Sequence, residues 1–304
     1  MIERRPFLNL ATHAILLAGV VCLMVPLWLA FVAATQDLAG VNSTPINWLP
    51  GSHLLENVAT AWARGEFGAR MATSLIVAIG VMVGKIVVAM LAAFAIVFFD
   101  WRAKTVVFWI IFVTLMLPLE VRIVPTYAVA ANALRPFQVI LDITGLSTLI
   151  NMATGVTVSL DWRMLNSYTG LILPLVATAT GTFLYRQFFM TIPEELVEAA
   201  RMDGAGPIRF LRDVLIPLSR TNIAALATIM FVYAWNQYLW PLLVTTDPSR
   251  ATVMVQLSRM VPRADGVPDW NVLMAAALIV MLPPLVVVML MQRWFVRGLV
   301  ATEK

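Results

Sequence analysis

The sequence predicts an all-α membrane protein with six transmembrane helices. The mean hydropathy of the 304-residue chain is +0.85, and only 12% of its residues are charged, against about 25% in a typical soluble domain. The apolar residues gather in long uninterrupted runs, which a water-soluble core does not need. Six of these runs reach the length of about 20 residues with which a helix crosses a bilayer.

The six runs predict one transmembrane domain that covers residues 1–304. The first run follows Arg4 and Arg5 but exceeds the roughly 7–15 apolar residues of a cleaved signal, so we interpret it as a retained helix. The predicted spans are 14–34, 72–98, 106–128, 168–189, 222–244 and 271–292.

The basic residues predict the orientation of these spans. With a cytoplasmic N-terminus, twelve Lys and Arg residues lie inside and seven outside, and cytoplasmic loops favour positive charge. The inner set is Arg4, Arg5, Arg102, Lys104, Arg186, Arg201, Arg209, Arg212, Arg220, Arg293, Arg297 and Lys304. Both termini are therefore expected in the cytoplasm.

Two longer loops then lie outside. Residues 35–71 contain Pro and Gly at positions typical of turns. Residues 129–167 include "PFQVILDITGLSTLINMATGVTVSLDWRML", whose mixed apolar and polar positions favour short amphipathic helices at the outer interface. A seventh crossing is the alternative, although Asp142 and Gly145 interrupt the apolar run.

The loop 190–221 is the most charged part of the chain and reads "TIPEELVEAARMDGAGPIRFLRDVLIPLSR" over 191–220. Thr191 and Glu194 have the spacing of a capping box, which predicts a helix that runs to about Met202. Gly204 suits a left-handed stop. Ala199 and Ala200 leave this helix without bulk, so another surface can approach its backbone closely.

A second short helix is expected after that stop. Pro207 tolerates a first helical turn, and Pro217 stops or bends the helix before the fifth span. One apolar face is predicted from Ile208, Leu211 and Leu215. A solvated connector is the plainer interpretation of the whole loop.

The sequence "EAARMDGAGPIRFLRDVLIP" resembles the EAA loop of bacterial ABC importer permeases. That pattern is E-A-A, three residues, G, nine residues and I-x-L-P; here Val214 and Ile216 replace the usual Ile and Leu. The positions that fit are Glu198, Ala199, Ala200, Gly204 and Pro217.

The resemblance extends along nearly the whole chain. "FVYAWNQYLWPLL" (231–243) and "MLPLEVRIVPTY" (116–127) are similar to segments of the carbohydrate-uptake, maltose-permease-like group. "MLPLEVRI", "YRQFFMTIPEELVEAARMDGAGP" and "MQRWFVRGLV" resemble the second permease subunits of sn-glycerol-3-phosphate importers. Residues 137–166 look like an extension relative to some members.

The resemblance implies the type I ABC importer permease fold, with a cytoplasmic coupling-helix loop, in the inner membrane of a bacterium. It also implies a division of labour. A periplasmic solute-binding protein would deliver sn-glycerol-3-phosphate, or a related glycerophosphodiester, to a heterodimer of this chain and a second permease subunit. Two copies of a cytoplasmic ATPase subunit would bind ATP and Mg²⁺, so this chain would hold no cofactor. The coupling residues implied are Glu198, Ala199, Ala200 and Gly204.

A superficial nucleotide-binding motif, "GVMVGK" (80–85), does not change this interpretation. Only three residues separate Gly80 from Gly84, and Ile86 stands where the motif needs Ser or Thr. The spacing instead predicts close packing of two helices at small residues. The sequence offers no Ser/His/Asp set, no carboxylate pair and no Cys/His cluster, so an enzyme or a metal site is not expected.

Lys85, Glu120 and Arg122 lie inside predicted spans, where an ionised side chain costs at least about 2.5–3.5 kcal/mol and faces a cavity or a partner. We expect Arg122 to offer donors to a phosphate group and Lys85 to add positive potential. The alternative is that Glu120 pairs with one of the two cations to assemble the bundle.

A second polar cluster lies in the fifth span and consists of Trp235, Asn236 and Gln237, of which the first two are the candidates. Asn inside a membrane needs a partner, and Trp can stack on the C–H face of a polyol. These two residues are candidates for the solute pathway, and packing between the two permeases is the competing interpretation.

Three other functions are alternatives. An uncharged sugar or oligosaccharide would need no Arg122 or Lys85. A stand-alone secondary transporter should show an internal repeat, which the sequence lacks. A membrane-embedded redox enzyme would need haem ligands, and His13 and His53 lie outside the spans. Membrane lipid is the expected surrounding, and nucleic acid is not an expected partner.

Overall fold

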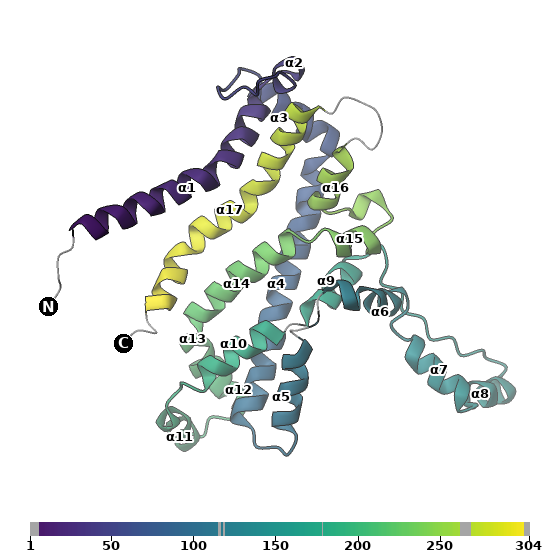
Figure 1. The fold of residues 1–304 in the computed structure, drawn as a ribbon. Coiled ribbons are helices and arrows are strands. Elements are labelled where there is room, and N and C mark those ends of the chain that lie inside the picture. Colours follow the sequence, from purple (N-terminus) through teal and green to yellow (C-terminus); the bar gives the residue numbers. More distant parts are fainter. Residues whose placement is uncertain (1–5, 115–116, 118, 178, 262–268, 301–304) are drawn as a thin grey trace. The chain divides into compact units, whose positions relative to one another are not determined.

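The computed structural model describes residues 6–114, 117, 119–177, 179–261 and 269–300 (Figure 1). The side chains of residues 6, 9, 119, 120 and 293–300 lie outside this description. Within these ranges the chain is helical and forms no strand, which confirms the predicted all-α class. The chain forms two compact units, residues 1–69 with 256–282 and residues 70–255 with 283–304.

The first unit is built around the end of helix α1 (Pro6–Thr35). It also holds α2 (Leu38–Val41), α3 (Leu54–Gly65) and the start of α17 (Trp270–Val300). The last carbonyls of a helix lack partners within it. Here the buried amide of Asn57 donates to Ala34 O at 2.9 Å and to Gln36 O at 2.7 Å, and Asn271 donates to Asn57 Oδ1 at 2.9 Å.

The second unit contains most of the remaining helices (Figure 1). They are the long α4 (Phe67–Phe98), α5 (Lys104–Val113), α6 (Leu119–Ala131), α7 (Arg135–Ile143), α8 (Leu146–Thr154), α9 (Tyr168–Val176), α10 (Ala179–Phe189), α11 (Glu194–Met202), α12 (Pro207–Phe210), α13 (Ile216–Leu218), α14 (Arg220–Trp235) and α15 (Leu239–Val244). Helix α16 (Val253–Met260) begins in this unit and ends in the first.

Three described helices are long and apolar enough to cross a membrane alone: residues 10–35, 67–98 and 270–292. Bent pairs of helices raise this number to as many as six. The expected third span, 106–128, is represented by α5 and α6 with a break between them. The expected fifth span breaks at Asn236–Tyr238, between α14 and α15. The six spans therefore stay a prediction.

The outer segment 135–154 forms two short helices rather than one straight one. Helices α7 and α8 meet at an angle of 78°, with Gly145 in the left-handed region between them. Their large apolar side chains are exposed, Ile143 at 81% and Met152 at 80%. Short amphipathic helices were expected here, and their place at a membrane interface stays a prediction.

The small residues of "GVMVGK" make a close helix contact. A Cβ atom added to Gly80 would lie 2.7 Å from Ile172 Cδ1, and one added to Gly84 would lie 2.6 Å from Val176 Cγ2. Both neighbours belong to α9, so α4 and α9 approach each other along this glycine face. The motif therefore serves helix packing, as its spacing predicts.

Gly84→Val is expected to destabilise the folded subunit by about 1–3 kcal/mol, because the added carbons enter space that Val176 occupies. Thermal unfolding of the purified protein in detergent measures the effect. Gly19→Val is the matched control, since nothing lies within 4 Å of a Cβ there. Val176→Ala should restore part of the loss, and equal midpoints for the two glycine variants would contradict the packing role.

The charged loop 190–221 contains α11, which starts later than the capping-box pattern predicts. Pro193 is the N-cap residue and no side chain caps the helix. The Thr191 hydroxyl instead donates to Phe188 O at 2.7 Å, so it completes the end of α10. The capping-box prediction is wrong, because the hydroxyl has a closer carbonyl acceptor one turn back.

The end of α11 confirms the predicted left-handed stop. Gly204 has φ +68°. Its N–H donates to Arg201 O at 3.0 Å, and the Ala205 N–H donates to Ala200 O at 2.9 Å. These two bonds form a Schellman motif, which fixes where the chain leaves α11.

The second helix of the loop restarts at Pro207 as predicted. Its predicted apolar face is confirmed at Leu215, which is buried, and at Leu211, which packs partly buried against the core, but not at Ile208. Residues Leu211–Leu215 form a π-helical turn between α12 and α13, and a π turn shifts the phase of all later side chains. Phe210 and Leu215 are therefore buried, whereas Ile208 is 81% exposed. The segment that ends at Leu218 then meets α14 at 77°.

Candidate functional site: a cationic cavity and a charged loop

Lys85 and Arg122 line one cavity of about 270 Å³ in the second unit, although 37 positions separate them in the chain. Helix α4 carries Lys85, and α6 carries Arg122 close to its start. Helix α14 supplies Tyr233, and the Lys85 Nζ lies 4.2 Å from the centroid of its ring. Three helices distant in sequence thus bring two cations and an aromatic ring together.

The charged side chains described in the lining of this cavity are both cations. Lys85 is only 5% exposed, and Arg122 Nε is buried without a hydrogen-bond partner. No carboxylate among the residues with described side chains forms an ion pair with either cation. The contact with the Tyr233 ring stabilises the ammonium only partly, by about 0.5–2 kcal/mol. An anion bound here would gain from both cations.

Three hydroxyl-bearing side chains were missed by sequence reasoning. Thr114, Thr180 and Tyr233 all line the cavity. The Thr114 hydroxyl already donates to Ile111 O at 2.6 Å, so its oxygen can still accept a hydrogen bond. A tyrosine inside an apolar span was a visible signal for Tyr233. The sequence offered no such signal for the two threonines, because only the packing of the helices brings them to the cavity.

Two other predicted pathway residues, Trp235 and Asn236, do not line this cavity. Trp235 is 2% exposed, and its ring stacks on Phe231 at 5.9 Å between centroids. Asn236 is exposed and caps the end of α14, where its N–H donates to Val232 O at 3.1 Å. Glu120 lies in the first turn of α6, but its side chain is outside the described part of the structure.

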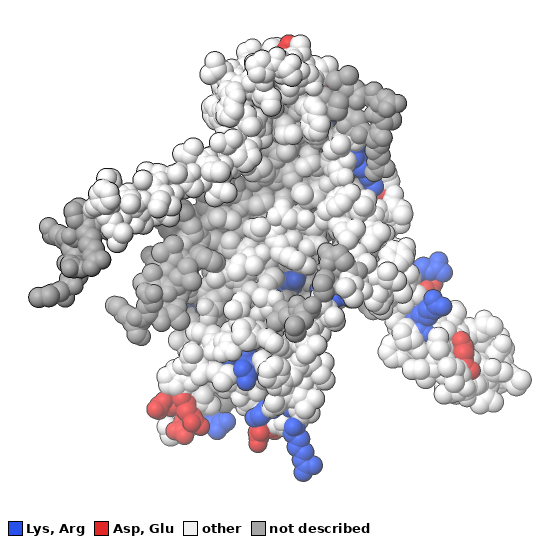
Figure 2. Space-filling model, viewed as in Figure 1, with Lys and Arg blue, Asp and Glu red and all other residues white. Residues whose placement is uncertain are grey.

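The four residues predicted to couple to an ATPase lie on α11 and at its end. Glu198, Ala199 and Gly204 are exposed, whereas Ala200 is partly buried against the core of its own unit. Figure 2 shows acidic and basic side chains gathered where α11 and the start of α5 lie, below a surface that is mostly white. The loop is therefore the charged end of an apolar unit.

One packed core joins the charged loop to the cavity. Phe94, Phe189 and Phe210 meet in it, with the ring centroids of Phe98 and Phe210 at 5.4 Å. Val197 and Ala200 of α11 pack against this core. Met230 belongs to the core and also lines the cavity. Displacement of α11 would therefore act on side chains that touch the cavity wall.

A family model and full-length relatives both match this chain, and both describe transport permeases. The family model described as "binding-protein-dependent transport system inner membrane component" matches residues 85–300. The chain is 48% identical to the sn-glycerol-3-phosphate transport system permease protein UgpE of Salmonella typhi, and 46% identical to that of Escherichia coli O157:H7. Each alignment covers 100% of both chains, including the segment 137–166.

A solved structure resembles the fold at lower sequence identity. It is described as the crystal structure of a bacterial ABC transporter involved in the import of the acidic polysaccharide alginate. The TM-score is 0.75 at 18% identity, and the match covers 97% of this chain and 99% of the other. This likeness shows the fold and carries no conclusion about the solute.

Proposed function

Because the chain belongs to the family of binding-protein-dependent transport system inner membrane components, we propose that it is a permease subunit that imports sn-glycerol-3-phosphate or a related glycerophosphodiester. The observation that carries the proposal is the full-length identity of 46–48% to permeases named for that solute. The cavity supplies a physical reason, since a phosphate would lie between Lys85 and Arg122.

The cavity favours a small anionic solute in two ways. Its volume of about 270 Å³ is slightly below the ~300–1,000 Å³ typical of small-molecule sites, which suits a three-carbon phosphate better than an oligosaccharide. Arg presents a rigid fork of donors that matches phosphate oxygens, and the hydroxyls of Thr180 and Tyr233 suit a polyol. An uncharged sugar would offer neither cation a charged partner.

Transport by the whole importer tests the proposal. The chain is reconstituted in vesicles with a second permease, the ATPase subunits and a periplasmic binding protein of the same importer. We expect ATP-driven accumulation of labelled sn-glycerol-3-phosphate and none of maltose. Accumulation of the sugar instead would support the uncharged-solute alternative, and accumulation without ATPase subunits would overturn the importer assignment.

We further propose that α11 is the coupling helix, seated in a cleft of an ATPase subunit in the cytoplasm. Exposed apolar side chains on a solvated loop indicate a partner surface, and Met202 is 83% and Ile208 81% exposed. Exposed Ala199 permits close approach of that partner, and Glu198 beside it offers a charge. Both termini then lie on the same side as this loop, in the cytoplasm.

Ala199→Trp is expected to reduce ATP-driven uptake by an order of magnitude while leaving the subunit folded, because its bulk points into solvent rather than into the core. Uptake into vesicles and co-purification of the ATPase subunit measure the effect. Ala200→Trp is the comparison: its side chain meets the core, so it should also lower the thermal midpoint of the permease. Normal uptake by Ala199→Trp would contradict the docking proposal.

A further inference from the structure

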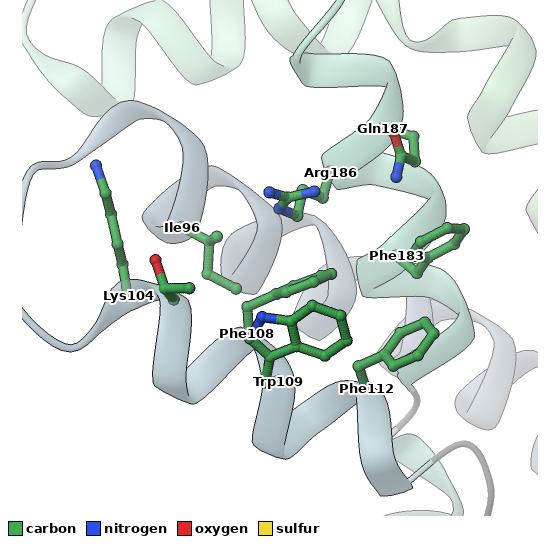
Figure 3. Close-up of a pocket in the computed structure, with 9 residues that line it drawn as sticks. Ile96, Lys104, Phe108, Trp109, Phe112, Phe183, Arg186 and Gln187 are labelled. Carbon is green, nitrogen blue, oxygen red and sulfur yellow. The ribbon is translucent and has the colours of Figure 1, made fainter.

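A second cavity of about 320 Å³ lies between α5 and α10, apart from the cationic cavity described above. Figure 3 shows Phe108, Trp109 and Phe112 of α5 on one side, with Phe183 and Arg186 of α10 opposite them. The four aromatic side chains make a wall, and the Arg186 cation lies beside it. Nothing in the proposed transport path uses this cavity.

The guanidinium of Arg186 is held in place in this cavity, but one of its donors lacks a hydrogen-bond acceptor. The guanidinium carbon of Arg186 lies 4.2 Å from the centroid of the Phe108 ring, which fixes the orientation of the group. Its Nε is buried without a hydrogen-bond partner. No described carboxylate forms an ion pair with Arg186. A buried donor of a charged group that lacks an acceptor costs about 1–3 kcal/mol or more, so an anionic acceptor would be stabilised there.

A second cation lies at the edge of the cavity. Lys104 is the first residue of α5 and lines the cavity at the end away from Phe112 (Figure 3). Its Nζ is 3.1 Å from Asp100 Oδ1, but the Asp100 side chain is 98% exposed and so attracts the ammonium only weakly. Lys104 can therefore turn toward an anion near Arg186.

The position of the cavity identifies the kind of anion. Both cations lie at helix ends that connect to the charged loops, while Trp109 and Ile110 on the outward face of α5 are 55% and 61% exposed. Exposed Trp beside cations is typical of the zone where a membrane meets water, and basic pockets between helices on the cytoplasmic side bind lipid headgroups. We propose that this cavity binds one anionic phospholipid, with its headgroup at Arg186 and Lys104 and an acyl chain along the aromatic wall.

Lipid retention by the assembled importer tests the proposal. Native mass spectrometry of the complex in detergent, with phosphatidylglycerol or phosphatidylcholine added, should show preferential retention of the anionic lipid. Arg186→Gln is expected to lower phosphatidylglycerol occupancy about tenfold and Lys104→Gln about threefold, as charge-assisted hydrogen bonds of unequal burial predict. Arg186→Lys should retain part of the preference. Arg212→Gln, on an exposed arginine outside the cavity, is the matched control.

A second measurement keeps the proposal testable if Arg186→Gln fails to assemble. Brominated phosphatidylglycerol should quench the Trp109 fluorescence, obtained as the difference between wild type and Trp109→Phe, more strongly than brominated phosphatidylcholine. Equal quenching by the two lipids, or equal retention of both by the wild type, would overturn the proposal. If pairing with the second permease abolished the quenching of Trp109 by both brominated lipids, a protein surface would cover the cavity. That result would also overturn the proposal.

Discussion

Arg122→Gln is expected to lower the import of a phosphorylated solute, measured as kcat/KM, by roughly 10- to 150-fold. Hydrogen bonds to a charged group contribute about 1.5–3 kcal/mol each, and 1.4 kcal/mol corresponds to a factor of ten. Glutamine retains a donor and much of the length of the arginine side chain but removes the charge from the cavity that Lys85 and Tyr233 share with it. Solute-dependent uptake by reconstituted vesicles measures the effect.

The ATPase activity of the same complexes distinguishes binding from assembly. Basal ATP hydrolysis should change far less than solute uptake. The reason is that the cavity lies beside α4, α6 and α14 rather than at the charged loop. Arg163→Gln is the matched control, since that arginine is exposed and pairs with Asp161 at 2.8 Å. Parallel loss of hydrolysis and uptake in Arg122→Gln would assign the residue to assembly of the bundle.

Gly204→Val should reduce ATP-driven accumulation by roughly 5- to 30-fold. Gly204 has φ +68°, and a β-branched residue in the left-handed region is strained by about 1–2 kcal/mol, which corresponds to that factor in an equilibrium. The strain acts on the two hydrogen bonds that close α11, so it displaces the helix that we propose docks on the ATPase. Uptake and the ratio of ATP hydrolysed to solute accumulated are the measurements.

Gly206→Val provides the control for backbone conformation. Gly206 is two residues away, and nothing lies within 4 Å of a Cβ at either position. Its φ of −71° is in the ordinary extended region, so the same side chain is accommodated without strain. Equal loss of uptake in both variants would show that bulk in the loop matters rather than the left-handed turn. Unchanged uptake in Gly204→Val would contradict the role of α11 in coupling.

Much of the charged loop could be predicted from local chemistry. Gly204 marks a helix stop because glycine adopts a positive φ easily, and Pro207 marks a helix start because proline fixes φ near the helical value. Thr191 was misassigned, because the pattern of a capping box does not reveal that Phe188 O is an available acceptor. Ile208 was assigned to the buried face because a regular helical period was assumed, and the π turn at Leu211–Leu215 changes that period.

The sequence by itself determined the class of the protein: its apolar runs allow only helices with internally satisfied hydrogen bonds in lipid, and the spacing of the EAA loop identifies the family. It also identified Lys85 and Arg122 one at a time, because a charge inside a span is costly wherever it lies. Only the tertiary structure decided that the two cations share a cavity with Tyr233, while Trp235 and Asn236 lie elsewhere. The physical reason is that Arg122 and Tyr233, 37 and 148 positions from Lys85 in the chain, meet Lys85 only through helix packing. That packing depends on the shape of both partners, as in the contact at Gly80 and Gly84 that brings α4 against α9.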